Sequence, residues 1–276
     1  MLSNRLTTAC GSESMSESIT QKLPGATGKE RTAAHGMLFL GTEPACGKTT
    51  VMTGLAAVLH DYDVPVRAIK PLGIGAHKKD SAEMSFMSII SKSAIDYPLQ
   101  SLNYPPSMTE SEWKELVLTG IGNKSETFSL IEIPGTPATP INFLRDEDGQ
   151  LTHEWSTMAD LAAAFGMPSI LVASHCIDSL ERIELSMTYL ESKNLSVCGI
   201  VTVETNKNEG QALDDRMHFH DFELMLKNRF RTEFLGKLNF SPVVSVPKIT
   251  QGNLKKCIEN DLDLLEFRRH LEIAVN

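Results

Sequence analysis

The segment Gly41-Thr-Glu-Pro-Ala-Cys-Gly-Lys-Thr-Thr50 has the residue types of a phosphate-binding loop. An apolar run, residues 37–40, precedes it, and an amphipathic helical pattern, residues 51–60, follows it. Gly47 lets backbone N–H groups approach an anion, and the positive end of the next helix points to the same place. Lys48 supplies a cation for the β- and γ-phosphates, and Thr49 offers a hydroxyl to Mg²⁺. We therefore predict a nucleotide-phosphate site here.

The spacing of this loop departs from the strict pattern for such loops. That pattern places four residues between its two glycines, whereas five separate Gly41 from Gly47, so that Thr42 stands where the first glycine belongs. The competing interpretation is an ordinary strand–helix turn that contains Gly-Lys-Thr by chance. The flanking strand and helix patterns favour the phosphate loop.

Composition narrows the class of protein. Of the 276 residues, 41% are hydrophobic and 22% are charged, which suits one large α/β domain. The net charge is −9, so a basic footprint for nucleic acid or for an anionic membrane is absent and no such partner is expected. Five scattered cysteines without metal-like spacing are typical of reduced thiols, and we expect a cytoplasmic protein without a signal peptide or transmembrane span.

Strand and helix patterns alternate along most of the chain. Residues 1–35 are polar and aperiodic, and we predict a disordered tail followed by a single domain over residues 36–276. The predicted strands are apolar on both faces, which indicates a mostly parallel sheet in a three-layer α/β fold. We expect strands at residues 37–40, 64–70, 128–132, 169–173, 197–203 and 243–246. We expect helices at residues 51–60, 81–93, 109–119, 157–165 and 179–192, with two further helical stretches near the end of the chain.

The order of these motifs resembles dethiobiotin synthetase, a P-loop ATPase related to the partitioning and cobyrinate amidation enzymes. The resemblance spans about residues 37–246. It rests on the phosphate loop, whose five-residue spacing is also that family's, and on Lys70-Pro71 at the end of the second strand. Weaker support comes from Asp80-Ser-Ala, Glu132, Ala159-Asp-Leu, Ile170-Leu-Val and Gly199-Ile-Val201.

The resemblance implies a P-loop NTPase-type fold and a carbon–nitrogen ligase of the biotin pathway. Such an enzyme adds CO₂ to an amine of 7,8-diaminopelargonate, phosphorylates the carbamate with ATP and closes a cyclic urea. It also implies a homodimer, and ATP and Mg²⁺ as cofactors. Lys48 and Lys70 would be catalytic, because Lys70 would hold the γ-phosphate and the carbamate as negative charge grows. Thr49, Asp80 and Glu132 would ligate Mg²⁺ through hard oxygen atoms.

The remaining predicted nucleotide contacts follow the loop and one later strand. They are Gly41, Thr42, Glu43, Cys46, Gly47, Lys48, Thr49 and Thr50, with Glu204 and Asn206 near the base. The family's adenine-reading asparagine aligns with Val203, and Asn206 is close enough in sequence to replace it. Asp80 has an equally good competing interpretation as the N-cap of its helix. A carboxylate at the end of an apolar strand is costly without a partner, which favours the metal role for Glu132.

Several positions depart from the family pattern. The family has a glycine-rich run after its strand-end glutamate, whereas this chain has Glu132-Ile-Pro-Gly-Thr-Pro137. Ile74 and Pro44 stand where the family has serine and threonine. These changes concern the substrate side of the site. They leave an alternative open, namely an ATP-binding switch or scaffold of the same superfamily with no ligase activity.

Overall fold

The computed structural model describes residues 36–73, 77–91, 100–101, 115, 127–145 and 148–275. All of them belong to one compact unit, Ala33–Asn276. The predicted tail, residues 1–35, lies outside the described residues. So does the predicted helix at residues 109–119, apart from Glu115, which is helical.

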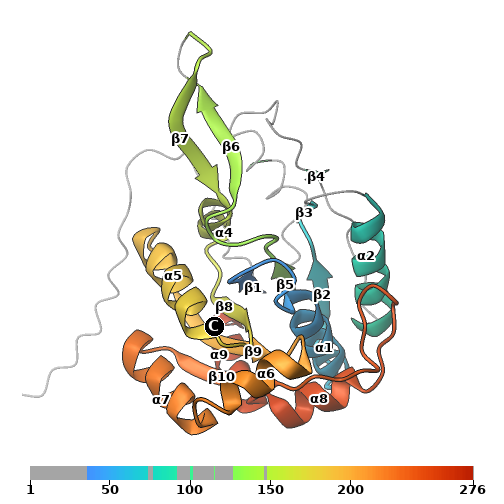
Figure 1. Cartoon of the computed structure of the whole chain (residues 1–276). Helices are drawn as coiled ribbons and strands as arrows, with labels where there is room; N and C mark the ends of the chain where they lie inside the picture. Colours follow the sequence, from blue (N-terminus) through green and yellow to red (C-terminus); the bar gives the residue numbers. More distant parts are fainter. Residues whose placement is uncertain are drawn as a thin grey trace, which may run out of the picture. The chain divides into compact units, whose positions relative to one another are not determined.

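One six-stranded sheet forms the centre of this unit, and all its neighbouring strands are parallel (Figure 1). Its spatial order is β10 (Glu233–Leu238), β9 (Val197–Val203), β8 (Ser169–Ser174), β1 (Gly36–Gly41), β5 (Phe128–Glu132) and β2 (Val66–Ile69). In this register Leu38 of β1 lies beside both Ile131 of β5 and Ser169 of β8. The carboxyl ends of β1, β5 and β2 therefore meet at one edge, where parallel α/β sheets form their sites.

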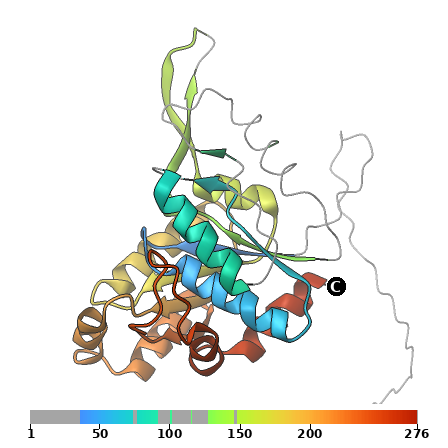
Figure 2. The same cartoon turned by 90° about the vertical axis from the view of Figure 1, so that its right-hand side faces the viewer.

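Both faces of the sheet are buried, because alternate residues of each strand enter different cores. In β1, Met37 and Phe39 belong to one hydrophobic cluster, and Leu38 and Leu40 to the other. Helices α1 (Lys48–Asp61), α2 (His77–Ser91), α8 (Leu254–Asp261) and α9 (Leu264–Val275) cover the first face. Helices α4 (Met158–Phe165), α5 (Ser179–Ser192), α6 (Lys207–Asp214) and α7 (Phe219–Phe230) cover the second (Figure 2). The predicted three-layer α/β fold is confirmed.

An antiparallel hairpin that the sequence pattern did not reveal precedes α4. It consists of β6 (Pro140–Arg145) and β7 (Leu151–Thr157), and Figure 1 shows it projecting beyond the sheet. The predicted helix at residues 157–165 is confirmed from Met158, with Thr157 as its N-cap. A second small pair, β3 (Leu72–Gly73) and β4 (Gln100–Ser101), is parallel.

The predicted strand at residues 243–246 is wrong. Pro242 and Pro247 flank this Val-rich run, and proline cannot donate to a strand ladder. The segment forms turns instead, with a single isolated bridge between Ser245 and Thr250. The sixth strand is β10, whose alternation is interrupted by Gly236 at a register shift and is therefore hard to recognise in the sequence.

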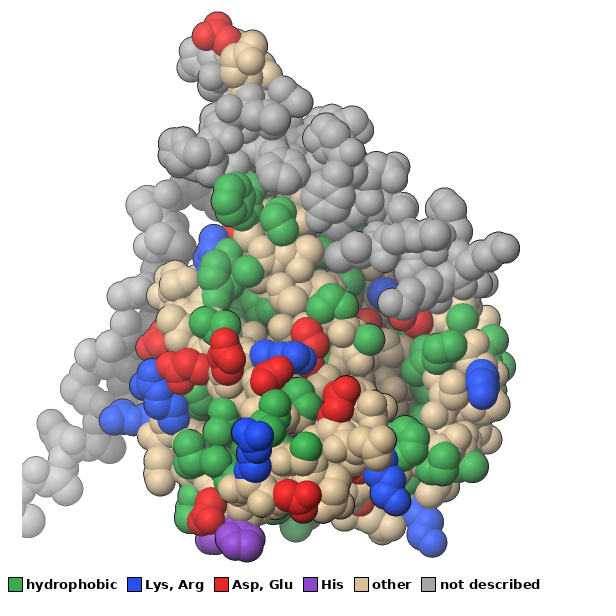
Figure 3. All heavy atoms as spheres, in the orientation of Figure 1, with side chains coloured by type: hydrophobic (Ala, Val, Ile, Leu, Met, Phe, Trp, Pro, Cys, Tyr) green, Lys and Arg blue, Asp and Glu red, His purple; other side chains and the backbone are tan. Residues whose placement is uncertain are grey.

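Basic and acidic side chains are interspersed on the face that Figure 3 shows, rather than gathered by sign. Among the described residues, no helix combines the length and the apolar character needed to cross a bilayer.

Candidate functional site

The predicted phosphate loop connects β1 to α1 as expected. Gly47 is the N-cap of α1, with φ of 100°, a conformation that side-chain-bearing residues rarely adopt. A Cβ atom added there would lie 2.7 Å from the Val203 side chain, so the close approach of the loop to β9 also requires glycine. Because the first N–H groups of α1 have no partner within the helix, the loop and the helix end form a favourable place for an anion.

Lys48 is buried, with 5% of its surface exposed, and its ammonium group lies over the loop. Its Nζ donates to the carbonyl oxygen of Gly135 at 3.2 Å and to that of Glu43 at 3.4 Å. Gly135 lies in the segment that follows β5. The ammonium group is therefore held by neutral carbonyl groups, which a phosphate can replace with a stronger charge-assisted contact.

Glu43, Thr42 and Cys46 hold the loop from behind rather than line the cavity described below. The Glu43 carboxylate accepts from the Ser174 N–H at 3.0 Å and forms an ion pair with Arg182 at 3.3 Å. The Thr42 hydroxyl donates to the same carboxylate. Burial, the largest influence, raises the pKa of the Cys46 thiol, so this cysteine is a loop filler rather than a reactive nucleophile.

A connected chain of polar groups joins the loop to the ends of β5 and β2. Thr49 Oγ1 donates to Glu132 Oε2 at 2.7 Å, and Glu132 Oε1 lies 3.7 Å from Lys70 Nζ. Lys70 in turn forms an ion pair with Glu83 of α2. The Lys70 and Glu132 side chains are only 6% and 5% exposed. The fold thus brings two predicted metal ligands and the second predicted catalytic lysine into one buried cluster.

Glu83 is the member of this cluster that sequence reasoning missed. The predicted ligand Asp80 belongs to α2, but its side chain lies outside the described part of the structure. Residues three apart on a helix share a face. The spacing from Asp80 to Glu83 was therefore the signal that could have identified the second carboxylate.

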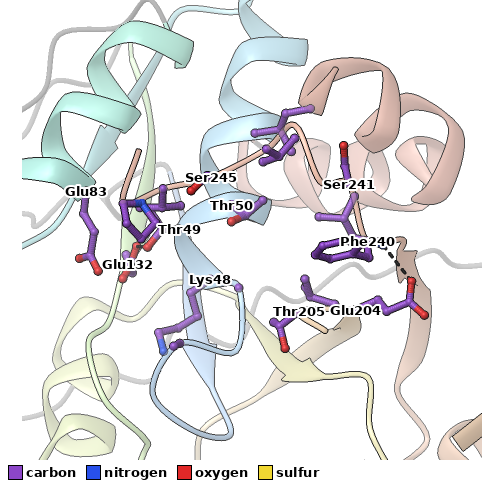
Figure 4. A pocket seen from close by; sticks show the side chains of 18 of the residues that line it. Lys48, Thr49, Thr50, Glu83, Glu132, Glu204, Thr205, Phe240, Ser241 and Ser245 are labelled. Carbon is purple, nitrogen blue, oxygen red and sulfur yellow. Dashed lines mark hydrogen bonds between the residues drawn. The ribbon is translucent and has the colours of Figure 1, made fainter. Parts of the chain in front are cut away.

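A cavity of about 710 Å³ runs from this cluster along the phosphate loop to the ends of β9 and β10. Figure 4 shows Glu83, Glu132 and Thr49 on one side, Lys48 and Thr50 in the middle, and Phe240 and Glu204 on the other side. The volume lies within the range of small-molecule sites in proteins. The lining includes Lys48, Thr49, Thr50, Lys70, Glu83, Glu132, Glu204, Thr205, Asn239, Phe240 and Ser241.

The segment after β10 was not predicted to belong to the site, yet it forms much of the second end of the cavity. Asn239, Phe240 and Ser241 line that end. Glu204 also lines this end. Asn206 is exposed, caps α6 by accepting from the Asn208 N–H at 3.0 Å, and is not among the residues that line the cavity. The sequence did not indicate this segment because it follows β10, and β10 was not predicted.

The positions that depart from the family pattern differ in where the structure places them. Pro44 and Pro134 both line the cavity. Ile133 is buried, and its N–H donates to the Phe39 carbonyl oxygen at 3.0 Å, so the chain continues the sheet beyond β5 instead of opening toward the cavity. Ile74 lies outside the described residues.

Comparison with known proteins finds relatives of low sequence identity and solved structures with a similar fold. No family model matches the chain. It is 28% identical to the ATP-dependent dethiobiotin synthetase BioD of Bacillus subtilis subsp. natto over 181 residues, 60% of this chain and 73% of that enzyme. Over 251 residues it is 22% identical to BioD of Bacillus velezensis, covering 82% of this chain and 94% of that enzyme.

Among solved structures, the MinD cell division protein of Aquifex aeolicus is similar with a TM-score of 0.52 and 12% identity, covering 86% of this chain and 96% of MinD. The MinC:MinD complex of the same organism gives a TM-score of 0.52 at 11% identity, covering 86% and 95% of the two chains. At this identity the likeness concerns the fold alone. The chain has an α/β fold of the P-loop NTPase type.

Proposed function

We propose that the protein is an ATP- and Mg²⁺-dependent carbon–nitrogen ligase that closes a cyclic urea on 7,8-diaminopelargonate with CO₂, the reaction of dethiobiotin synthetase. The observation that carries the proposal is the buried cluster of Thr49, Glu132 and Lys70 beside Lys48 in one cavity. The two ammonium groups of Lys48 and Lys70 lie near the oxygen atoms of Thr49 and Glu132 at the end of the phosphate loop. This set suits phosphoryl transfer, because catalysis of that reaction is mainly positioning and charge stabilisation.

Each residue of the cluster has a role in this proposal. The Lys48 ammonium would leave the Gly135 carbonyl and bind the β- and γ-phosphates. Lys70 would stabilise the charge that develops as a carbamate oxygen attacks the γ-phosphorus and ADP leaves. The second amine would then displace phosphate from the carbonyl carbon and close the ring. The Thr49 hydroxyl and the Glu132 carboxylate are hard oxygen donors that fit Mg²⁺, which would neutralise triphosphate charge when bound.

Because residues on the substrate side of the site differ from the family's, we expect weaker substrate binding than in a site with the family's residues. Pro44 and Pro134 can donate no N–H, and both line the cavity. A substrate carboxylate or amine that faces them loses hydrogen bonds worth about 1–3 kcal/mol each. A raised KM for the diamine with measurable turnover is the expected result.

An ATP-binding switch or scaffold without ligase activity is the second candidate. The observation that favours it is the ion pair between Lys70 and Glu83, because Glu83 competes with any anionic substrate for the ammonium group. Under this alternative, nucleotide binding changes the contacts of Lys48 with the segment after β5, and no product forms. In either case we expect a small-molecule ligand, a homodimer and a cytoplasmic location.

The deciding experiment measures phosphate release from ATP together with dethiobiotin by mass spectrometry. Release should require both bicarbonate and the diamine, and product should match phosphate one to one. Lys70→Ala should lower kcat more than it raises KM, because its contact strengthens only in the transition state. The matched control Lys227→Ala removes an exposed lysine and should behave as wild type. Tight ATP binding with no diamine-dependent product at millimolar substrate would contradict the ligase and favour the switch.

A further inference from the structure

The phosphate loop contains two residues with left-handed backbone, Ala45 with φ of 63° and Gly47 with φ of 100°. Glycine adopts this conformation freely. Alanine adopts it only where its surroundings enforce it, because its Cβ atom meets a neighbouring carbonyl oxygen. Turns of this kind aim successive backbone N–H groups at one point, which suits an anion. The shape of the loop therefore depends on how the residues before Ala45 are anchored.

Glu43 provides that anchor. The Thr42 N–H donates to the Val172 carbonyl oxygen at 3.0 Å and so continues the pairing of β1 with β8. Glu43 Oε1 then accepts from the Ser174 N–H at 3.0 Å, and Oε2 accepts from the Thr42 hydroxyl. The Glu43 carbonyl oxygen accepts from Lys48 Nζ at 3.4 Å. This one residue thus connects the end of β8 to the lysine that is proposed to bind phosphate.

The point to which Glu43 is anchored is itself fixed on two sides. The Ser174 carbonyl oxygen accepts from Ser179 Oγ, in the first turn of α5, at 2.6 Å. The next N–H along the chain, that of His175, donates to the Val203 carbonyl oxygen of β9 at 2.7 Å. The end of β8 therefore cannot follow the loop if the loop moves.

Arg182 of α5 supplies the counter-charge for this anchor. Its Nη1 lies 3.3 Å from Glu43 Oε1, and its Nη2 donates to Asp178 Oδ2 at 3.3 Å. The Glu43 side chain is only 17% exposed, and a carboxylate so placed is costly without a partner. The guanidinium group stays charged at every pH a protein meets. Arg182 is not among the described residues that line the cavity, so it can act on the loop only through Glu43.

From these contacts we infer that Arg182 is a positioning residue for phosphate binding. Through Glu43 it holds the strained loop in its anion-binding shape before a ligand arrives. Such preorganisation raises affinity, because the ligand does not have to order the loop. Binding in the cavity thus depends on a side chain of α5 that no ligand touches. This inference rests on the proposed nucleotide binding and adds a residue to it.

The test compares ATP with inorganic tripolyphosphate, which lacks the nucleoside, by isothermal titration in Mg²⁺. Arg182→Gln removes the charge and should weaken both ligands by the same factor, about fivefold, the upper end of the range for partly exposed ion pairs. Arg182→Lys keeps the charge and should recover most of the loss. Glu43→Ala removes every side-chain contact of the anchor and should weaken both ligands by roughly 10- to 100-fold.

A double-mutant cycle separates this role from a general effect on α5. Glu43→Gln keeps an acceptor for the Ser174 N–H, so it reports the charge alone. If Arg182 acts through Glu43, the double variant with Arg182→Gln should bind no more weakly than Glu43→Gln does. The matched control Arg229→Gln breaks another ion pair of α5, the one with Glu184, and should leave both affinities unchanged. Urea titration should show that Arg182→Gln and Arg229→Gln have similar free energies of unfolding.

Three results would overturn the positioning role while leaving nucleotide binding intact. The first is an Arg182→Gln protein with wild-type affinity for both ligands. The second is a loss for ATP without a loss for tripolyphosphate, since that would place Arg182 at the nucleoside. The third is a double variant whose losses simply add. If wild type binds neither ATP nor tripolyphosphate, the proposed function itself is wrong, and the role of Arg182 is wrong with it.

Discussion

At the scale of single residues, Lys48 is the group on which the proposed nucleotide binding most depends. Its buried ammonium donates to the carbonyl groups of Gly135 and Glu43, which a phosphate would replace in the proposed function. Lys48→Ala should weaken ATP–Mg²⁺ binding by about 1.5–3 kcal/mol, because it removes a charge-assisted hydrogen bond. Isothermal titration measures this, with Lys227→Ala as the control. Equal affinities for wild type and Lys48→Ala would contradict the assignment of the loop.

The contact between Thr49 and Glu132 makes a second prediction at the same scale. If these oxygens hold Mg²⁺, Thr49→Ala and Glu132→Gln should each reduce the gain in ATP affinity that Mg²⁺ provides by about tenfold, or about 1.4 kcal/mol. Affinity measured in EDTA should change much less. Thr49→Ser retains the hydroxyl and should retain the gain. The metal role fails if both variants respond to Mg²⁺ as wild type does.

At the scale of elements, the capping box of α4 fixes the junction between the β6–β7 hairpin and the second helical layer. Asp160 Oδ2 accepts from the Thr157 N–H at 2.7 Å and from its hydroxyl at 2.8 Å, and Asp160 Oδ1 pairs with Lys193 at 2.9 Å. Asp160→Ala should lower the free energy of unfolding by about 1 kcal/mol, measured by urea titration. Asp178, at the N-cap of α5, makes no such cap, so Asp178→Ala should cost less.

The same carboxylate gives this cap a pH dependence. Burial alone raises the pKa of Asp160, but hydrogen bonds from Lys193 and from Thr157 outweigh it, and the net pKa lies below its ordinary 3.8. A carboxyl pKa lower in the folded than in the unfolded chain stabilises the fold above the unfolded value. That contribution is lost as the pH falls through the folded pKa. The stability difference between wild type and Asp160→Ala should therefore shrink below about pH 4.

At the scale of the whole molecule, His175 links three segments that are distant in the sequence. It follows β8 with a side chain only 1% exposed, and its Nε2 lies 2.9 Å from Asp214 of α6, which also pairs with Lys237 of β10 at 3.0 Å. Phe219 and Phe222 of α7 lie beside the imidazole ring. Burial, the largest effect, lowers the pKa of His175 below its ordinary 6.5, although Asp214 opposes the shift and Lys237 adds to it.

Acidification should therefore weaken the fold through this histidine. Between the folded and the unfolded pKa of His175, the unfolded chain binds a proton that the folded chain does not, so stability falls as the pH drops below about 6.5. His175→Gln retains a hydrogen-bonding group without titrating. Its melting temperature should fall less between pH 7.5 and 5.5 than that of wild type. Parallel curves for the two proteins would show that His175 does not contribute.

The sequence by itself determined the features that local rules control. Gly47, Lys48 and Thr49 predicted the phosphate loop because a tight turn, a cation and a hydroxyl must follow one another in order. Apolar runs predicted five of the six strands of the sheet, since strands buried on both faces have a recognisable composition. β10 was missed because it is partly exposed and interrupted at Gly236, and the β6–β7 hairpin was missed as well.

Only the tertiary structure decided which distant groups meet. Thr49 and Glu132 are 83 positions apart, and their hydrogen bond depends on the register between β1 and β5. The ion pair between Lys70 and Glu83 depends on how α2 packs. The hydrogen bond between Phe240 and Glu204, at the far end of the cavity, depends on how the segment after β10 packs. Such contacts form only when segments far apart in the sequence come together around a shared core. No local pattern of residues encodes that long-range closure of the chain.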